Sequence, residues 1–481
     1  MTATGRPLVA GVDSSTGATK VELRDLASGD LVAAGRSAHP STLPPVSEQH
    51  PDDWWTALVD ALGQCGDARD DVVAIAVAGQ QHGLVLLDDD LRPLRPAVLW
   101  NDTTAAPAAA ALVDHLGAAA WAQACGSVPV ASFTVAKLAQ VAIDEPDLLR
   151  RVARILLPHD ELTRRLTGRT TTDRGDASGT GWWSPAAGSW RTDLLELAAP
   201  GTARADWLPE VLGPETAAGT LLPDAAAALG LPAGIPVGPG TGDNMAAALG
   251  VGLGPGDVCM SLGTSGTVYA RSARPTTDAT GAVAGFADAT GGFLPLVCTL
   301  NATRVTDAVA GLLGVDHAGW DALALAGASD GLTLLPWFDG ERTPDRPGAT
   351  GVLHGLRTDV GRTSLARAAC EGVLCGLLDG VDALVAAGVR VDGRRVLTGG
   401  GARSAAYPQV LADLTGEVWE VVADEEFVAR GAALQAAAIV SGCRVEDQLG
   451  RWARPDGRPV TPLRTDGDEV RARYRALRDR F

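Results

Sequence analysis

The apolar and polar positions of the chain alternate in blocks that predict an α/β protein. The first hundred residues contain three short strand patterns, then a helical pattern with Trp54, Leu58 and Leu62 on one face, then a buried strand. This order favours a mixed sheet with helices packed on it. The strands are expected at Leu8–Val12, Ala18–Leu26, Leu31–Gly35 and Asp71–Ala78, and the helix at Pro51–Cys65.

A second unit with a similar beginning starts near residue 257. A strand, a Gly/Ser/Thr turn and a returning strand come first, and helices alternate with strands further on. Because polar hairpin turns occur near residues 14 and 264, we expect a duplicated architecture. Glycine is dense over Gly240–Gly256, which predicts domains at 1–245 and 246–481. The strands of this unit are expected at Asp257–Leu262, Thr267–Ala270, Arg395–Leu397 and Val418–Val422, and its helices at Ser364–Ala387, Ala405–Leu414 and Val428–Val440.

Composition and charge exclude several classes of protein. The 481 residues are 46% hydrophobic and 20% charged, which is typical of a globular chain with ample material for a core. Forty basic against 58 acidic residues give a net charge of −18, which disfavours binding to nucleic acid or to an anionic membrane surface. The apolar runs are shorter than the roughly 20 residues that a membrane span needs.

The cysteines indicate a reducing compartment. All seven are scattered without a C-x-x-C pair, which argues against a disulfide framework or a zinc ribbon. The N-terminus does not have the pattern of a signal peptide, so we expect a cytoplasmic protein. The motifs of P-loop NTPases, Rossmann dehydrogenases and protein kinases are missing from the sequence.

Two small-residue turns have the chemistry to bind phosphate. In the first, Asp13 could hold Mg²⁺ while Ser15 and Thr16 approach phosphate oxygens. In the second, Thr264 and Ser265 could do the same. Each turn alone is more simply explained as a polar hairpin. Together, facing each other across a cleft, they could grip a triphosphate.

Glycine-rich segments add two further candidates. Gly400, Gly401 and Ala402 follow a predicted strand, where glycines would let a base or a phosphate lie against the backbone. Asp243 precedes an apolar helix. It is equally well interpreted as an N-cap or as a carboxylate that accepts a proton from a substrate hydroxyl.

Polar clusters at the ends of two strands suggest a sugar site. Gln81 and His82 follow one apolar strand, and Trp100, Asn101 and Asp102 follow another. Amide, imidazole and carboxylate groups recognise sugar hydroxyls, and an indole provides an apolar wall. A single histidine is more often structural, but two such clusters are harder to dismiss.

Taken in order, these motifs resemble the FGGY family of carbohydrate kinases over nearly the whole chain. The matching segments are Gly11–Thr16, Ser47–Pro51, Ala78–Gly83, Leu99–Asp102, Gly242–Asn244, Ser261–Gly266, Gly340–Pro344 and Gly399–Ser404. The sequence departs from the family pattern at Thr104, where arginine is usual.

The resemblance implies two RNase-H-like domains of the actin/hexokinase/Hsp70 type, with a cleft between them. It implies phosphoryl transfer from MgATP to O5 of the ketopentose D-xylulose, and less firmly a homodimer. Asp243 would be the catalytic residue and would contact the sugar. Gln81, His82, Trp100, Asn101 and Asp102 would line the sugar site. Asp13 would hold Mg²⁺, and nucleotide binding would fall to Ser15, Thr16, Thr264, Ser265, Gly400, Gly401 and Ala402.

Three alternatives stay open at this point. A sister kinase could phosphorylate ribulose, fuculose or glycerol instead. An actin- or Hsp70-like ATPase would hydrolyse ATP without sugar and would not need the polar clusters at Gln81 and Asn101. A non-catalytic sugar sensor is disfavoured by the intact Asp243 and phosphate turns.

Overall fold

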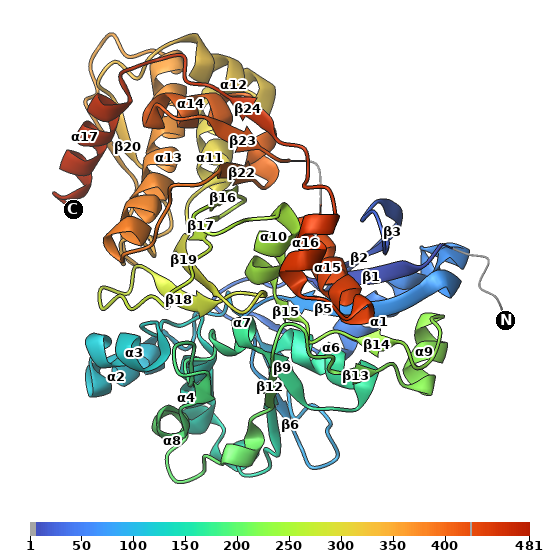
Figure 1. Cartoon of the computed structure of the whole chain (residues 1–481). Helices are drawn as coiled ribbons and strands as arrows, with labels where there is room; N and C mark the ends of the chain where they lie inside the picture. The colour runs from blue at the N-terminus through green and yellow to red at the C-terminus, as the bar shows by residue number, and fades with distance from the viewer. Residues whose placement is uncertain (1–5, 424–425) are drawn as a thin grey trace.

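Two seven-stranded sheets, each with helices packed against it, organise the chain (Figure 1). The computed structural model describes residues 6–423 and 426–481. We call the part built on the first sheet the first lobe and the part built on the second sheet the second lobe.

The first sheet has the strand order β13-β14-β5-β1-β2-β3, with β15 also paired to β5. Strand β1 is antiparallel to β2 and parallel to β5, so a hairpin meander is extended by parallel strands. The strands are β1 (Leu8–Ser14), β2 (Ala18–Asp25), β3 (Leu31–Ala38), β5 (Val72–Gly79), β13 (Gly219–Thr220), β14 (Pro236–Val237) and β15 (Thr241–Gly242).

The second sheet repeats this plan. Its order is β18-β19-β17-β16-β22-β23-β24, in which β16 is antiparallel to β17 and parallel to β22. The order β3-β2-β1-β5-β14 therefore corresponds to β19-β17-β16-β22-β23, and the expected duplication is confirmed. The strands are β16 (Val258–Leu262), β17 (Gly266–Ala270), β18 (Ala284–Ala287), β19 (Phe293–Thr299), β22 (Arg395–Thr398), β23 (Trp419–Val421) and β24 (Arg458–Val460).

A long, mainly helical segment is inserted into the first lobe between β5 and β13. It lies below the first sheet in Figure 1. It begins after the polar segments that follow β5 and β7 (Ala97–Val98). Its elements are α2 (Ala106–Leu116), α3 (Ala118–Cys125), α4 (Thr134–Asp144), α5 (Pro146–Leu149), β8 (Arg154–Leu156), α6 (Pro158–Thr167), β9 (Thr171–Asp173), α7 (Arg174–Ala177), β10 (Trp183–Ser184), β11 (Ser189–Trp190), α8 (Thr192–Ala198) and β12 (Glu210–Leu212).

The remaining elements cover the two sheets. In the first lobe these are β4 (Glu48–Gln49), α1 (Pro51–Gly63), β6 (Val85–Leu87), β7 (Ala97–Val98) and α9 (Pro223–Leu229). In the second lobe they are α11 (Thr303–Leu313), α12 (His317–Ala326), β20 (Thr333–Leu335), β21 (Val352–His354), α13 (Arg362–Ala386), α14 (Ala406–Thr415) and α17 (Gly467–Arg478). Helix α16 (Val445–Arg451) packs instead on α15 (Phe427–Ser441) beside the first lobe, where Gln448 Nε2 donates to the carbonyl oxygen of Leu26 at 3.5 Å. None of the helices in the described part of the chain has the length and apolar character to cross a membrane.

Helices α10 (Asp243–Val251) and α15 (Phe427–Ser441) pack closely against each other beside the first sheet (Figure 1). A Cβ atom added to Gly431 would lie 1.9 Å from the carbonyl oxygen of Ala246, and one added to Gly11 of β1 would lie 1.9 Å from that of Ala429. Glycine is required at both positions because backbone approaches backbone. Helix α15, near the end of the chain, thus contacts the first sheet, which is built from residues near its beginning. The division into domains at 1–245 and 246–481 stays a prediction.

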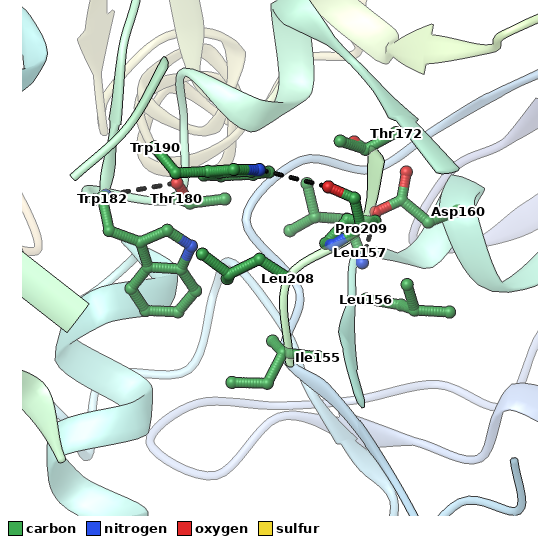
Figure 2. A pocket seen from close by; sticks show the side chains of 10 residues that line it. All are labelled: Ile155, Leu156, Leu157, Asp160, Thr172, Thr180, Trp182, Trp190, Leu208 and Pro209. Carbon is green, nitrogen blue, oxygen red and sulfur yellow. Dashed lines mark hydrogen bonds between the residues drawn. The ribbon is translucent and has the colours of Figure 1, made fainter. Parts of the chain in front are cut away.

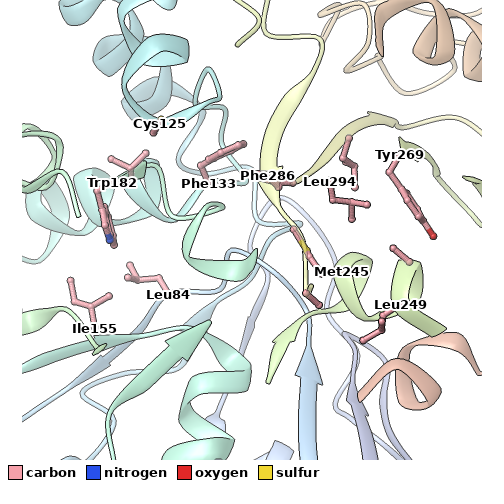
Figure 3. Packing of buried hydrophobic residues seen from close by; sticks show 14 of the residues in the cluster. Leu84, Cys125, Phe133, Ile155, Trp182, Met245, Leu249, Tyr269, Phe286 and Leu294 are labelled. Carbon is pink, nitrogen blue, oxygen red and sulfur yellow. The ribbon is translucent and has the colours of Figure 1, made fainter. Parts of the chain in front are cut away.

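One hydrophobic core crosses from lobe to lobe. It brings Phe133 and Trp182 of the insertion together with Met245 of α10 and with Phe286 and Leu294 of the second sheet (Figure 3). The rings of Phe133 and Phe286 lie 6.2 Å apart between centroids. The lobes are therefore joined by an apolar seam.

Candidate active site

Strand β5 brings Asp13 and Asp243 to the same edge of the first sheet. Its last residue, Gly79, pairs with Ser14 of β1 on one side and with Gly242 of β15 on the other. Asp13 directly precedes Ser14 and Asp243 directly follows Gly242, so the two carboxylates come together where the strands end. Both were singled out in the sequence, and the sheet topology explains their proximity.

Asp243 is the first residue of α10 and is half-buried. Burial, and then the negative charge of Asp13, raise its pKa to about 7, while hydrogen bonds from Asn244 act in the opposite direction. The backbone N–H and the side-chain Nδ2 of Asn244 donate to Asp243 Oδ1 at 2.8 and 3.0 Å. A carboxylate with this pKa is matched to general-base chemistry near neutral pH.

Asp13 is buried beside Lys20 and Ser15. Burial raises its pKa, whereas Lys20, whose Nζ lies 3.4 Å from Asp13 Oδ2, and the Ser15 hydroxyl lower it. Lys20 also pairs with Glu426 at 2.7 Å, at the start of α15. The negative charge of Asp13 raises the pKa of Asp243, and a pair of neighbouring carboxylates is a favourable place for a divalent cation.

The residues present fit Mg²⁺ in the way that kinase sites hold it. Such sites use one or two carboxylates, and substrate phosphates and water complete the octahedron. Within residues 6–423 and 426–481, no group of three or more His, Cys, Asp or Glu side chains is placed to hold a metal ion. Asp13 is the candidate that would hold Mg²⁺ through water, and this role stays a prediction.

The side chains of the first phosphate turn are bonded within the protein. The Thr16 hydroxyl donates to Gln80 Oε1 at 3.1 Å and accepts from Trp100 Nε1 at 2.8 Å. Ser15 donates to Asp13. These bonds fix the turn and place Trp100 against it. Nucleotide contacts by Ser15 and Thr16 stay a prediction.

His82 is held in an unusual backbone conformation with a defined tautomer. Its φ of 65° lies in the left-handed region, and its Nδ1 contacts the carbonyl oxygen of Gly179 at 2.8 Å. Burial, helped by the charges of Lys137 and Arg342, lowers the pKa of His82 to about 3. The ring is therefore neutral, Nδ1 carries the proton, and Nε2 is a hydrogen-bond acceptor.

Neighbouring side chains fix His82 and Gln81 in place. The ring of Phe133 stacks on His82 with centroids 4.9 Å apart, and Lys137 Nζ donates to the His82 carbonyl at 2.7 Å. Gln81 Oε1 accepts from Asn244 Nδ2 at 2.8 Å, while its Nε2 is buried without a partner among the described residues. An unpaired amide donor beside an imidazole acceptor suits a polyhydroxylated ligand.

Asn101 and Asp102, which follow Trp100, have different surroundings. Asp102 accepts hydrogen bonds from the backbone N–H groups of Ser47 at 2.7 Å and Thr104 at 2.9 Å. The Thr104 hydroxyl donates to the same carboxylate, so the threonine that replaces the usual arginine helps to fix this loop. Asn101 Oδ1 is buried without a partner among the described residues. A direct contact of Asp102 with sugar stays a prediction.

The second lobe contributes a turn and a cavity. Thr264 is exposed and Ser265 half-buried in the turn between β16 and β17. A Cβ atom on Gly399 (φ 87°) would lie 2.7 Å from the carbonyl oxygen of Leu262, whereas one on Gly400 would meet open space. Ala402 lines a cavity of about 530 Å³ together with Arg403, Val421, Val422, Ala423, Pro455, Asp456 and Arg458. This volume is within the range of small-molecule sites.

Comparison with known proteins identifies the family. Residues 8–250 match the N-terminal domain of the FGGY family of carbohydrate kinases, and residues 258–439 match its C-terminal domain. The chain belongs to this family.

Full-length relatives and solved structures of FGGY kinases agree with this assignment. A xylulose kinase of Streptomyces coelicolor is 46% identical over 469 residues, covering 97% of this chain and 95% of its own. A xylulose kinase of Escherichia coli is 36% identical over 85% of this chain and 84% of its own. The crystal structure of xylulose kinase from Bifidobacterium adolescentis has 41% identity and a TM-score of 0.87, covering 98% of this chain and 99% of its own.

Sequence reasoning missed several residues of this FGGY site. Asn244 was recognised only as part of a motif, although it joins Asp243 to Gln81. Lys137 is one of two lysines in the chain and supports His82 from α4. Its isolation in a lysine-poor sequence was the available signal. The stacking of Phe133 on His82 left no local signal, because 51 residues separate them in the chain.

Proposed function

We propose that this chain transfers the γ-phosphoryl group of MgATP to the O5 hydroxyl of D-xylulose, giving D-xylulose 5-phosphate. The observation that carries the proposal is Asp243, a half-buried carboxylate with a pKa of about 7 that Asn244 links to Gln81 and that lies beside Asp13 of the first phosphate turn. The names of its full-length relatives support the choice of sugar. A cytoplasmic location, use of Mg²⁺ and a homodimer belong to the same proposal.

In this mechanism the chain supplies alignment and charge. Gln81 Nε2 donates to a sugar hydroxyl and His82 Nε2 accepts from another, which orients the terminal hydroxyl toward Asp243. Asp243 accepts the proton of that hydroxyl as the bond to phosphorus forms. Mg²⁺, when bound near Asp13, neutralises charge on the phosphates. The cavity beside Ala402 is our candidate for the nucleoside part of ATP.

An acceptor panel tests the proposed activity. ADP release would be measured with D-xylulose, D- and L-ribulose, L-fuculose, glycerol, gluconate and no sugar. We expect kcat/KM to be highest for D-xylulose and release without sugar to be slow. A higher value for another acceptor would establish a sister kinase, which the Thr104 departure keeps as the second candidate. Equal release with and without sugar would support the ATPase alternative.

The dependence of the rate on pH should report the ionisation of Asp243. Because the ionised form accepts the proton, kcat/KM for the sugar should fall about tenfold per pH unit well below a midpoint near 7 and level off above it. Steady-state rates from pH 5.5 to 9 with the sugar varied provide the measurement. A flat profile over this range would contradict the role of Asp243.

Substitution of His82 should weaken sugar binding selectively. His82→Asn keeps a residue that tolerates the left-handed backbone but removes the ring acceptor and its stacking on Phe133. We expect KM for D-xylulose to rise about tenfold, the effect of one lost hydrogen bond, while KM for ATP stays within about twofold. Initial rates with each substrate varied in turn provide the measurement, and equal rises in both KM values would contradict it.

A further inference from the structure

A buried charged cluster lies directly behind the segment that carries Asp243. His159, in the first turn of α6, has its Nε2 atom 3.2 Å from Asp160 Oδ1, 3.4 Å from Asp173 Oδ1 and 3.4 Å from Asp176 Oδ2. All four residues are buried. Burial alone would lower the pKa of His159, but the three carboxylates raise it to about 9, so the ring is an imidazolium at neutral pH. Burial raises the pKa of Asp176 well above its usual value.

The cluster contacts the Asp243 segment at two points. Thr241 Oγ1 donates to Asp173 Oδ2 at 2.7 Å. A Cβ atom on Gly240 (φ 77°) would lie 2.6 Å from His159 Nδ1, so the ring packs against the backbone of Gly240. Asp173 also caps α7 by accepting from the N–H groups of Gly175 and Asp176 at 2.8 and 2.9 Å. Asp173 is thereby fixed from two directions and offers Thr241 a fixed acceptor.

The far side of the cluster has no room for a substrate. Asp160 lines a cavity there with nine other residues, among them Thr172 and Trp182 (Figure 2). Its volume of about 10 Å³ is roughly that of one water molecule. The cluster therefore has no space to bind a ligand beside Asp160. Its contacts on the opposite side, with Gly240 and Thr241, connect it to the segment that carries Asp243.

We propose that His159 and Asp173 are positioning residues, which act through Thr241 to hold Asp243 in register with the sugar hydroxyl. The inference rests on the proposed function of Asp243. Backbone pairing of β15 with β5 fixes the segment along the strand, and the hydroxyl of Thr241 adds a side-chain anchor two residues before the carboxylate. Phosphoryl transfer is sensitive to such placement, since an error of 1 Å can lower the rate by roughly 10²-fold.

A matched pair of variants at Thr241 separates positioning from folding. Thr241→Val keeps the shape but removes the hydroxyl, and Thr241→Ser keeps the hydroxyl. We expect kcat to fall about tenfold in the valine variant and to stay within about twofold in the serine variant, with both KM values and Tm little changed. Thr167→Val is the control, because the bonds of this buried hydroxyl are local: it donates to Thr163 O at 2.8 Å and accepts from the Arg169 N–H at 3.2 Å.

His159→Gln extends the test to the charge. It should lower kcat by about 10- to 100-fold and leave KM for ATP within about twofold. If this variant does not fold, the Thr241 pair still decides the question. Wild-type turnover on the acceptor panel tests the proposed function, whereas the ratio of variant to wild-type kcat on the best acceptor tests the inference. Unchanged kcat in Thr241→Val, or equal losses in Thr241→Val and Thr241→Ser, would overturn it.

Discussion

Asp243→Asn should lower kcat by about 10²–10⁴-fold while raising Tm. The loss follows from removing the group that accepts the proton, which is commonly worth this factor. The gain in stability follows from linkage. The pKa of Asp243 is higher in the folded chain, about 7, than its ordinary value of 3.8, so folding is favoured by protonation and is weakened as pH rises between these values. Asparagine removes that unfavourable charge at neutral pH.

Because kcat should fall while Tm rises, the prediction separates a loss of chemistry from a loss of folding. A variant that loses activity by misfolding would lose Tm as well. ADP release, thermal unfolding and calorimetric ATP binding would be compared in wild type, Asp243→Asn and Asp193→Asn. The last is a control in which an exposed carboxylate paired with Arg191 becomes an amide. Turnover of Asp243→Asn within about threefold of wild type would remove Asp243 from the mechanism.

The elements of both sheets could be predicted because their signals are local. Apart from β3, which runs to Ala38 instead of Gly35, the strands and helices assigned from the sequence end within two residues of their predicted limits. Strand alternation, polar turns and helical periodicity act over a few residues, so they can be read without the fold. The duplicated order of strands followed from two such turns, near residues 14 and 264.

Long-range contacts explain what the sequence could not reveal. The backbone N–H group of Ser47, 55 residues earlier, donates to Asp102, which the sequence did not predict, and the sugar contact of Asp102 stays a prediction. The hydroxyl of Thr16 bonds to Gln80 and Trp100, which the sequence did not predict either, and its contact with phosphate stays a prediction. The mainly helical insertion after residue 105 was not predicted, because its apolar positions pack on one another and on the lobe seam without a repeated motif.

The close approach of α10 and α15 should make Gly431 the most sensitive helical glycine near the site. Gly431→Ala places a methyl group 1.9 Å from the backbone oxygen of Ala246, which neither helix can avoid by turning a side chain. We expect the free energy of unfolding to fall by about 3 kcal/mol, which is in the upper part of the range for overpacked cores. For a chain of 481 residues that unfolds as one unit, the corresponding fall in Tm is about 3 °C. Because α10 begins with Asp243, separating the helices should also lower kcat.

Gly63→Ala is the matched control, since Gly63 is also helical but an added Cβ would meet no atom within 4 Å. There the lost flexibility of glycine in the unfolded chain should stabilise the protein by about 0.5–1 kcal/mol. Thermal unfolding and kcat would be measured for both variants at one protein concentration. If Gly431→Ala kept wild-type Tm and turnover, the two helices could not lie as close as this packing requires. The position of Asp243 would then need another support, because α15 is the element that holds α10 against the first sheet.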